Sequence, residues 1–417
     1  MPLILSDFAK QEADVALNHG MPGLRIQYFR GPVWGKTNEQ LKKQIVEGNN
    51  PITGRPVMQE IVEKLTKPLT AGEQKTGEYK RDKGQPTYTG TPDELQKLFL
   101  ERRFTDFMPV ILPTEEKVAE MLKATSHSPD EQLGKMNPGS EAGDNWTYTV
   151  KDAAINAVMA GARPEYFPVI LALGSTSMTA VNVSDNGFSA GAVINGSIRD
   201  EIKLNYEVGA VGPYAEANTT IGRAWNLLSI NGGNCGKVGT TYMGTVGNSQ
   251  NALALIIAEN ERDSPFKPLS VRRGFKVNES VVTLFVGWGI LSAKNWKVDV
   301  WGPNMNYPQI IKDIYNQQDA MFGTIAVLSP PIARYVADAG YDTAEKFTEW
   351  VTQSTNTPAA AAPPPRKSAG VQGAPPPGRF SGGGPVFTVV VTGGSNNNYW
   401  CMGNMRPQQM VEIDKWR

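Results

Sequence analysis

The clearest pattern of apolar and polar positions lies in residues 217–230. Its apolar residues recur at the spacing of one helical face: Ala217, Ile221, Ala224, Trp225 and Leu228. Arg223 and Asn226 fall on another face of the same helix. A helix of this kind covers a core with one side and presents polar groups to a cleft with the other.

Short apolar runs alternate with amphipathic segments through most of the remaining chain. Strands are expected at 3–5, 24–29, 108–112, 190–194, 280–287, 297–301, 324–328 and 386–391. Helices are expected at 8–17, 150–161, 165–174, 249–262, 331–339 and in segments beginning near Pro308 and Asp342. This alternation predicts an α/β fold with a mostly parallel sheet flanked by helices.

Composition divides the chain into segments. Residues 1–70 hold strand and helix signals sufficient for a partial α/β unit, and polar residues 71–90 form a linker or arm. The main α/β domain covers 91–355. Pro, Ala and Gly dominate 356–385, which predicts an extended linker. Residues 386–417 then return to the main domain with an added strand, because 386–391 is a continuous β-branched run.

Charge and cysteine content narrow the class of protein. Lys plus Arg and Asp plus Glu both number 41, so the formal charge is zero and nothing favours nucleic acid or a membrane surface as a partner. Two cysteines cannot form a disulfide framework, and no apolar run has the length of a membrane span. These features predict a cytoplasmic protein.

Two familiar site patterns fail on their spacing. Gly35-Lys36-Thr37 lies between a strand and a helix, but Arg30 stands where a phosphate loop requires glycine. The two histidines, His19 and His127, are far from each other and from both cysteines, so no metal site is predicted. No motif in the sequence identifies a cofactor.

The candidate catalytic residues are Cys235 and Glu259. Cys235 lies in a glycine-rich loop after the 217–230 helix, where a thiol could meet a ligand; a small buried apolar side chain is the alternative. Glu259 ends the apolar 249–262 segment, and a helix C-terminus there would raise the pKa of its carboxyl and suit a general base. Its neighbour Glu261 is expected to be solvated.

The candidate substrate-binding residues lie at predicted strand ends and on the polar helix face. They are Asn195, Arg199, Arg223, Asn226, Gly393, Gly394 and Cys401. Guanidinium groups recognise carboxylates and phosphates, although salt bridges to Glu201, Glu216 or Glu259 are an equal alternative for the two arginines. Gly393, Gly394 and Cys401 follow the last predicted strand, where open α/β sheets bind ligands, and packing is the alternative for Cys401.

The stretches 17–25, 32–35, 56–62 and 65–69 resemble the closing part of UGSC-type (seleno)proteins. Residues 100–350 resemble uncharacterised proteins associated with that family. The resemblance implies an α/β domain and a Cys- or selenocysteine-containing motif, but no Cys-Gly-Ser-Cys sequence exists in this chain. No catalytic residue is therefore carried over, and the motif would belong to a second protein subunit.

These observations predict a subunit of a hetero-oligomeric enzyme that acts on a small molecule. The chain would supply the binding cleft, and its partner would supply thiol chemistry, either redox or cleavage of a carbon–heteroatom bond, as in an oxidoreductase or lyase. The alternatives are a self-sufficient enzyme that uses Cys235 and a non-catalytic scaffold or binding subunit. Residues 1–70 are the expected intersubunit surface, through Met21, Leu24, Ile26, Phe29, Val33 and Trp34.

Overall fold

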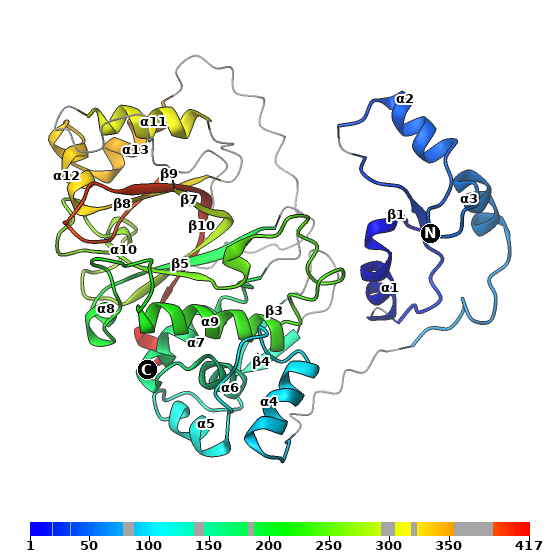
Figure 1. The fold of residues 1–417 in the computed structure, drawn as a ribbon, viewed down its shortest axis with the longest axis horizontal. Coiled ribbons are helices and arrows are strands. Elements are labelled where there is room, and N and C mark those ends of the chain that lie inside the picture. The colour runs from blue at the N-terminus through cyan, green and yellow to red at the C-terminus, as the bar shows by residue number, and fades with distance from the viewer. Residues whose placement is uncertain are drawn as a thin grey trace.

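The computed structural model describes residues 1–18, 20–33, 35–77, 87–136, 146–181, 187–292, 305–317, 323–353 and 387–417. The segments expected at 297–301 and 356–385, together with His19 and Trp34, lie outside these ranges. Figure 1 shows the chain coloured from its N-terminus to its C-terminus. Residues 1–77 form a small unit, and residues from 87 onward build the main body.

The N-terminal unit is a β-α-β motif followed by three further helical elements. β1 (Leu3–Leu5) pairs in parallel with β2 (Gln27–Phe29), and α1 (Ala9–Asn18) connects them. α2 (Asn38–Leu41), a π-helical turn (Lys42–Val46) and α3 (Val57–Thr66) follow. The 3–5 strand and the 8–17 helix are thus confirmed, whereas the 24–29 strand is shorter than expected.

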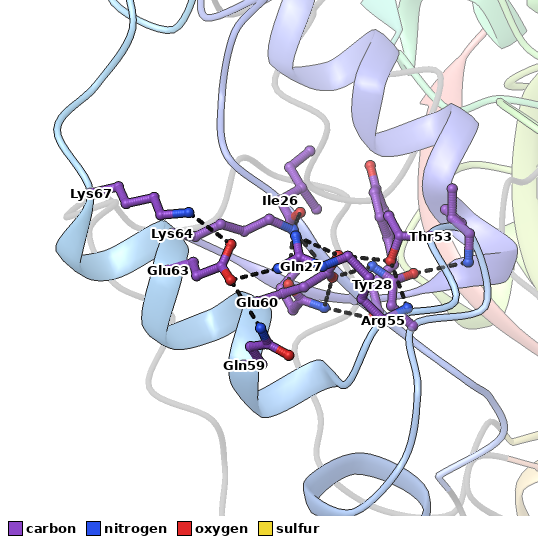
Figure 2. Close-up of polar contacts among 12 residues, drawn as sticks. Ile26, Gln27, Tyr28, Thr53, Arg55, Gln59, Glu60, Glu63, Lys64 and Lys67 are labelled. Carbon is purple, nitrogen blue, oxygen red and sulfur yellow. Dashed lines mark hydrogen bonds and ion pairs between the residues drawn. The ribbon is translucent and has the colours of Figure 1, made fainter.

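The buried face of α3 is polar at its centre. Glu60 is 3% exposed and accepts hydrogen bonds from Gln27 Nε2 (3.0 Å), Asn50 Nδ2 (2.7 Å) and Thr53 Oγ1 (2.7 Å). Figure 2 shows Gln27, Thr53 and Glu60. Burial opposes ionisation, but the three hydrogen bonds and the nearby Lys64 ammonium outweigh it and lower the pKa of Glu60. The carboxylate therefore ties α3 to β2 and to the loop before α3.

Helices form both outer layers of the main body. One group comprises α4 (Pro92–Glu101), α5 (Glu115–Leu122), α6 (Val150–Ala160), α7 (Phe167–Ser175), α8 (Ile198–Glu201) and α9 (Glu216–Asn231), with a hairpin of β3 (Gln132–Met136) and β4 (Trp146–Thr149). The other comprises α11 (Tyr307–Gln317), α12 (Pro330–Asp338) and α13 (Ala344–Thr352). Figure 1 shows the two groups on opposite sides of the central strands.

The central sheet has six strands in the order β6-β5-β7-β10-β8-β9. Their bounds are β5 (Ser189–Asn195), β6 (Leu255–Ala258), β7 (Val281–Ser292), β8 (Thr324–Leu328), β9 (Phe387–Val391) and β10 (Trp400–Glu412). Only β5–β6 and β8–β9 pair in parallel, while β5–β7, β7–β10 and β8–β10 are antiparallel. The prediction of a mostly parallel sheet is therefore wrong.

The direction of the strands was mispredicted because an alternation of strands and helices along the sequence does not reveal which neighbouring strands run antiparallel. Each half of the sheet holds a parallel pair joined through helices, followed by one long antiparallel strand, β7 or β10. The apolar pattern of β7 predicts a strand without its direction, and the more polar 400–412 segment that forms β10 was not predicted as a strand. The chain after 386 contributes two strands, and β10 lies inside the sheet, not at its edge.

The sheet curls until its two edge strands meet. Asn260 N donates to Val391 O (2.7 Å) and Thr392 Oγ1 donates to Ala258 O (2.7 Å), which joins the ends of β6 and β9. Leu269 lies in α10 (Leu269–Arg272), and its side chain belongs to an apolar cluster that the curled sheet encloses. The cluster's other buried members are Val193, Ile257, Phe285, Ile325, Val327, Val390, Cys401 and Met405.

Two outer cores cover the curled sheet. The first packs α5, α6, α7 and α9 against β5, β6 and β7, with Trp225 of α9 fully buried. The second packs α11, α12 and α13 against β8, β9 and the start of β10. The expected face of α9 is confirmed, since Ala217, Ile221, Ala224, Trp225 and Leu228 are all buried.

Two expected elements are wrong. The 249–262 helix is absent: a short 3-10 turn at Ser249–Asn251 precedes strand β6. For a short, fully apolar run, periodicity does not distinguish a buried helix from a buried strand. Here the run pairs with β5 and forms a strand. The 108–112 strand is also absent: these residues form no regular element. The apolar residue Val110 instead packs into the first core.

Candidate functional site

The enclosed face of the curled sheet carries polar side chains as well as apolar ones. Side chains alternate between the two faces of a strand, so Asn195 shares the inner face with Val193, and Thr283 shares it with Phe285. Val193 pairs with Thr283 in the β5–β7 ladder, which makes Asn195 and Thr283 diagonal neighbours. Glu259 follows β6 two residues after the inner residue Ile257. We call Asn195, Glu259 and Thr283 the inner polar cluster.

Glu259 is the ionisable residue of this cluster, and it is deeply buried. Its side chain is 1% exposed, and its Oε2 accepts hydrogen bonds from Asn195 Nδ2 (2.6 Å) and from the backbone N–H of Leu269 (2.7 Å). The Arg272 guanidinium approaches Glu259 Oε1 at 3.9 Å. Burial raises the pKa of the Glu259 carboxyl, and Arg272 with the two hydrogen bonds counteracts that rise only in part.

Several buried oxygen atoms on the inner face of the sheet and on α10 have no hydrogen-bond partner. Asn195 Oδ1 and Thr283 Oγ1 are two of them, and both residues are fully buried. Ser270 Oγ on α10 and Thr388 Oγ1 on β9 are two more. An unsatisfied buried polar group costs about 1–3 kcal/mol. Native proteins rarely tolerate such a concentration unless the groups serve a ligand, water or catalysis.

A second carboxylate, Glu261, lies beside the first. Glu261 Oε1 accepts hydrogen bonds from Asn195 Nδ2 (2.9 Å) and Gly196 N (2.9 Å), so one amide nitrogen contacts both acids. Arg199 Nε lies 3.2 Å from Glu261 Oε1, and Arg199 Nη1 donates to the Glu259 carbonyl (2.5 Å). The expectation of a solvated Glu261 at a helix end is wrong, because the β5 and β6 ends hold its side chain at 10% exposure.

The short helix α10 contacts this site through Leu269 and Arg272. The Leu269 N–H at its start binds Glu259, and Arg272 Nη2 at its end donates to Val389 O of β9 (2.6 Å). Arg272 Nε also donates to Lys267 O (2.9 Å). α10 therefore bridges the end of β6 and β9, through the Glu259 carboxyl, through Arg272 and through the buried side chain of Leu269.

The structure brings three of the predicted site residues together and separates others. Asn195, Arg199 and Glu259 meet at the ends of β5 and β6. Arg223 instead forms a bidentate ion pair with Asp106 (2.8 and 2.9 Å), which was not among its expected partners. Asn226 uses both ends of its amide to fix the chain before β6, through Asn251 O and Ala254 N. These last two residues have structural roles.

Both cysteines are buried apolar side chains. Cys235 is 1% exposed, its Sγ contacts Gly233 O at 3.5 Å, and burial raises the pKa of its thiol to about 12. Cys401 lies on β10 in the enclosed apolar cluster, and burial likewise raises its pKa to about 12. A nucleophilic cysteine requires a lowered pKa, so this geometry favours the packing alternative for both residues.

The glycines after β9 shape a loop that rests against the chain after α8. Gly393 has φ +97°, its N–H donates to Tyr206 O (2.9 Å), and its carbonyl accepts from Asn260 Nδ2 (3.1 Å). A Cβ at Gly394 would lie 2.4 Å from Val208 Cγ2. The glycines thus allow the loop after β9 to pack closely against the chain after α8. This contact lies next to Asn260, the residue after Glu259.

Sequence reasoning missed Arg272, which approaches Glu259, and the buried hydroxyl residues Thr283, Ser270 and Thr388. Their signal was weak, because isolated Ser and Thr residues in apolar strands are common. Arg272 could have been suspected only once β6 and β9 were known to adjoin. Comparison with protein-family models, with curated proteins and with solved structures gave no match.

Two absences apply to the described ranges only. There, no group of three or more His, Cys, Asp and Glu side chains is arranged to hold a metal ion. None of the helices found in those ranges has the length and apolar character needed to cross a membrane.

Proposed function

We propose that the protein is a subunit of an enzyme that performs general acid–base chemistry on a small polar molecule bound at the inner polar cluster. Glu259 is the acid–base residue, Asn195 and Thr283 bind the substrate, and Arg199 with Glu261 positions Asn195. The observation that carries the proposal is the pairing of a fully buried carboxyl of raised pKa with an unpartnered amide oxygen beside it.

The two carboxyl groups suit different roles. A buried acid of raised pKa retains a proton that it can give to a leaving group or, once ionised, can take from a carbon acid. Glu261, fixed by Arg199 and the Gly196 N–H, stays an acceptor that orients the Asn195 amide. This arrangement supports a lyase-type proton transfer with cleavage of a carbon–heteroatom bond. The two buried thiols give no support to a self-sufficient cysteine enzyme.

Glu259 is buried and bonded to the Leu269 N–H, so the proposal requires α10 to move when a substrate enters. The bonds that hold it are the Leu269 N–H to Glu259 and the Arg272 contacts to β9. A substrate that takes over the Glu259 carboxyl would release the first of these. Binding and opening are then coupled through one side chain.

Thr283→Val gives the sharpest test, because valine replaces an unpartnered hydroxyl with a methyl group of similar size. The full chain is screened by thermal shift and native mass spectrometry against millimolar amino acids, hydroxy acids and their amides. We expect at least one compound to stabilise the wild type, and Thr283→Val and Glu259→Gln to abolish that shift. The Thr219→Val variant, on the exposed surface of α9, is the control. Retention of the shift in Thr283→Val would refute the site.

The proposal that the chain is one subunit of a larger enzyme rests on the N-terminal unit. α3 exposes an apolar stripe on the side opposite Glu60: Met58, Val62 and Leu65 are 40%, 55% and 66% exposed. Their spacing places them on one helical face. We propose that this stripe contacts a second, different protein chain through an apolar surface of that chain, and that the partner carries thiol or selenol chemistry. The resemblance to UGSC-type proteins stays a prediction.

A further inference from the structure

The N-terminal unit contains an open cavity of about 490 Å³ between the end of β2 and the helical turns that follow it. Arg30 and Gly31 line one side, and Lys36, Gln40, Lys43 and Gln44 line the other. Cavities of this volume accommodate small ligands. Three of the six lining residues are cationic, which sets this cavity apart from the inner polar cluster.

We propose that this cavity binds a small phosphorylated molecule, with Arg30, Lys36 and Lys43 contacting its phosphate oxygens. Among the described residues, none of these three cations forms an ion pair with a carboxylate, whereas neighbouring Lys42 is paired with Glu47 at 3.5 Å. A guanidinium fork and two ammonium groups around one space are the donors that phosphate oxygens accept.

Gln44 holds part of the cavity wall in place. Gln44 Nε2 donates to Arg30 O and to Pro32 O (3.2 Å), and Gln44 Oε1 accepts from Lys36 Nζ. One glutamine therefore holds the loop after β2 against the helical turn and holds Lys36 at the wall. Such preorganisation reduces the ordering cost of binding.

This site differs from a phosphate loop. Thr37, which follows Lys36, is the N-cap of α2 and uses its hydroxyl to accept from Gln40 N (3.3 Å), while Gln40 Oε1 accepts from Thr37 N (2.9 Å). Its hydroxyl is thus committed to the capping box and does not serve a bound magnesium ion. Binding depends on side-chain cations instead of a glycine-rich backbone cradle.

The surrounding charges favour a small ligand over a nucleic acid. An Asp7 carboxylate oxygen lies 3.0 Å from the position a Cβ on Gly31 would take, so an acidic group borders the cavity. Glu39 and Glu47 are exposed on the same helical turns. A long polyanion would meet these carboxylates, whereas one or two phosphate groups fit between the three cations.

The test is calorimetric titration of inorganic pyrophosphate into the full chain. We compare the wild type with the Lys36→Gln/Lys43→Gln double variant and with a Lys42→Gln/Lys67→Gln control, which removes the same charge from paired lysines of the same unit. We expect about tenfold weaker binding in the first variant and a change of about twofold or less in the control. Hydrogen exchange should show protection by pyrophosphate confined to 30–44.

Three results would overturn the proposal: no saturable binding by the wild type, equal weakening in the two double variants, or protection elsewhere in the chain. A single-stranded oligonucleotide that binds more tightly than pyrophosphate would also reject the small-molecule class. If Lys36→Gln/Lys43→Gln unfolds the unit, Arg30→Gln, at an exposed position, repeats the comparison. None of these outcomes depends on Glu259.

Discussion

Asn195 Nδ2 donates a 2.6 Å hydrogen bond to Glu259 Oε2, while the Oδ1 atom of the same amide is buried without a partner. One side chain thus satisfies the carboxyl at the end of β6 and leaves an acceptor facing the enclosed side of the sheet. The pair also joins the two parallel strands at the point where β9 approaches. The proposed acid–base residue therefore lies where the sheet closes.

Replacing Glu259 with glutamine should change how stability depends on pH. The folded-state pKa of Glu259 is raised, so the folded protein binds this proton more tightly than the unfolded chain does. Its stabilising contribution is complete below the unfolded pKa and is lost as pH rises through the folded pKa. Glu259→Gln cannot ionise, and we expect it to gain stability relative to the wild type over that window, by at most about 1.4 kcal/mol per pH unit.

Urea unfolding at several pH values, followed through hydrogen exchange of β6 amides, measures this difference. A constant gap between the two proteins from acidic to alkaline pH would contradict a raised pKa. Glu259→Ala is the structural comparison, since it leaves the Leu269 N–H without its acceptor and leaves Asn195 Nδ2 with Glu261 Oε1 alone. We expect that variant to lose about 2–4 kcal/mol at every pH.

Cys235→Ala should lower stability without affecting ligand binding at the inner polar cluster. The side chain is buried against the loop after α9, and removal of a small core side chain costs about 1–3 kcal/mol. The native thiols should also react slowly with iodoacetamide, because burial raises both pKa values to about 12. Mass spectrometry of alkylated protein checks this, with urea-unfolded protein as the control; rapid native labelling of Cys235 would restore the nucleophile hypothesis.

Acid should loosen the N-terminal unit through Glu60. Its pKa is lowered, so its contribution to stability is present above the unfolded pKa and is lost as pH falls through the folded pKa. Glu60→Gln should therefore weaken α3 protection at neutral pH and remove much of the acid sensitivity. Hydrogen exchange of α3 amides reports this, and the paired surface lysine variant Lys67→Gln is the control. Identical acid profiles for Glu60→Gln and wild type would exclude the mechanism.

Local patterns predicted helices well because their signals lie within a few residues. The helix expected at 150–161 is α6, and the apolar face of α9 packs as its spacing indicates. Sheet order depends on long-range pairing, which no local pattern contains. β6 was therefore assigned as a helix, and the interior position of β10 was missed.

The candidate site was predicted in part for the same reason. Asn195, Arg199 and Glu259 lie near the ends of predicted strands or helices, where polar residues often form binding sites. Thr283 and Thr388 became site candidates only when curling placed their strands on one enclosed face. Cys235 stood out for its chemistry alone, and burial, which sequence does not show for a single residue, reverses that interpretation.

A chain break before β9 should leave the C-terminal segment bound. β10 pairs with β7 over Cys401–Glu412 and with β8 over Trp400–Gly403, so both of its edges are used. A protease site engineered at 365–371 allows cleavage of the folded protein. We expect the two fragments to co-elute on size exclusion and to separate only in denaturant. Release of the tail under native conditions would contradict the interior position of β10.

The α3 stripe makes the last prediction. Val62 and Leu65 are 55% and 66% exposed, and burial of such side chains in an interface contributes about 25 cal/mol per Å² of apolar area. Val62→Ser and Leu65→Ser should therefore lower recovery of a partner chain that co-purifies from the native host, by about tenfold for the double variant. The melting temperature should stay nearly constant, because Glu60 and Val57, which hold α3 to its own unit, are untouched. Gln59→Ser, at an exposed polar position of the same helix, controls for loss of helix propensity. Sedimentation of the isolated chain tests whether the stripe instead pairs two copies of this chain. If the wild type is a dimer and the double variant is a monomer, the stripe is a homodimer interface. The proposal of a hetero-oligomeric enzyme would then be wrong.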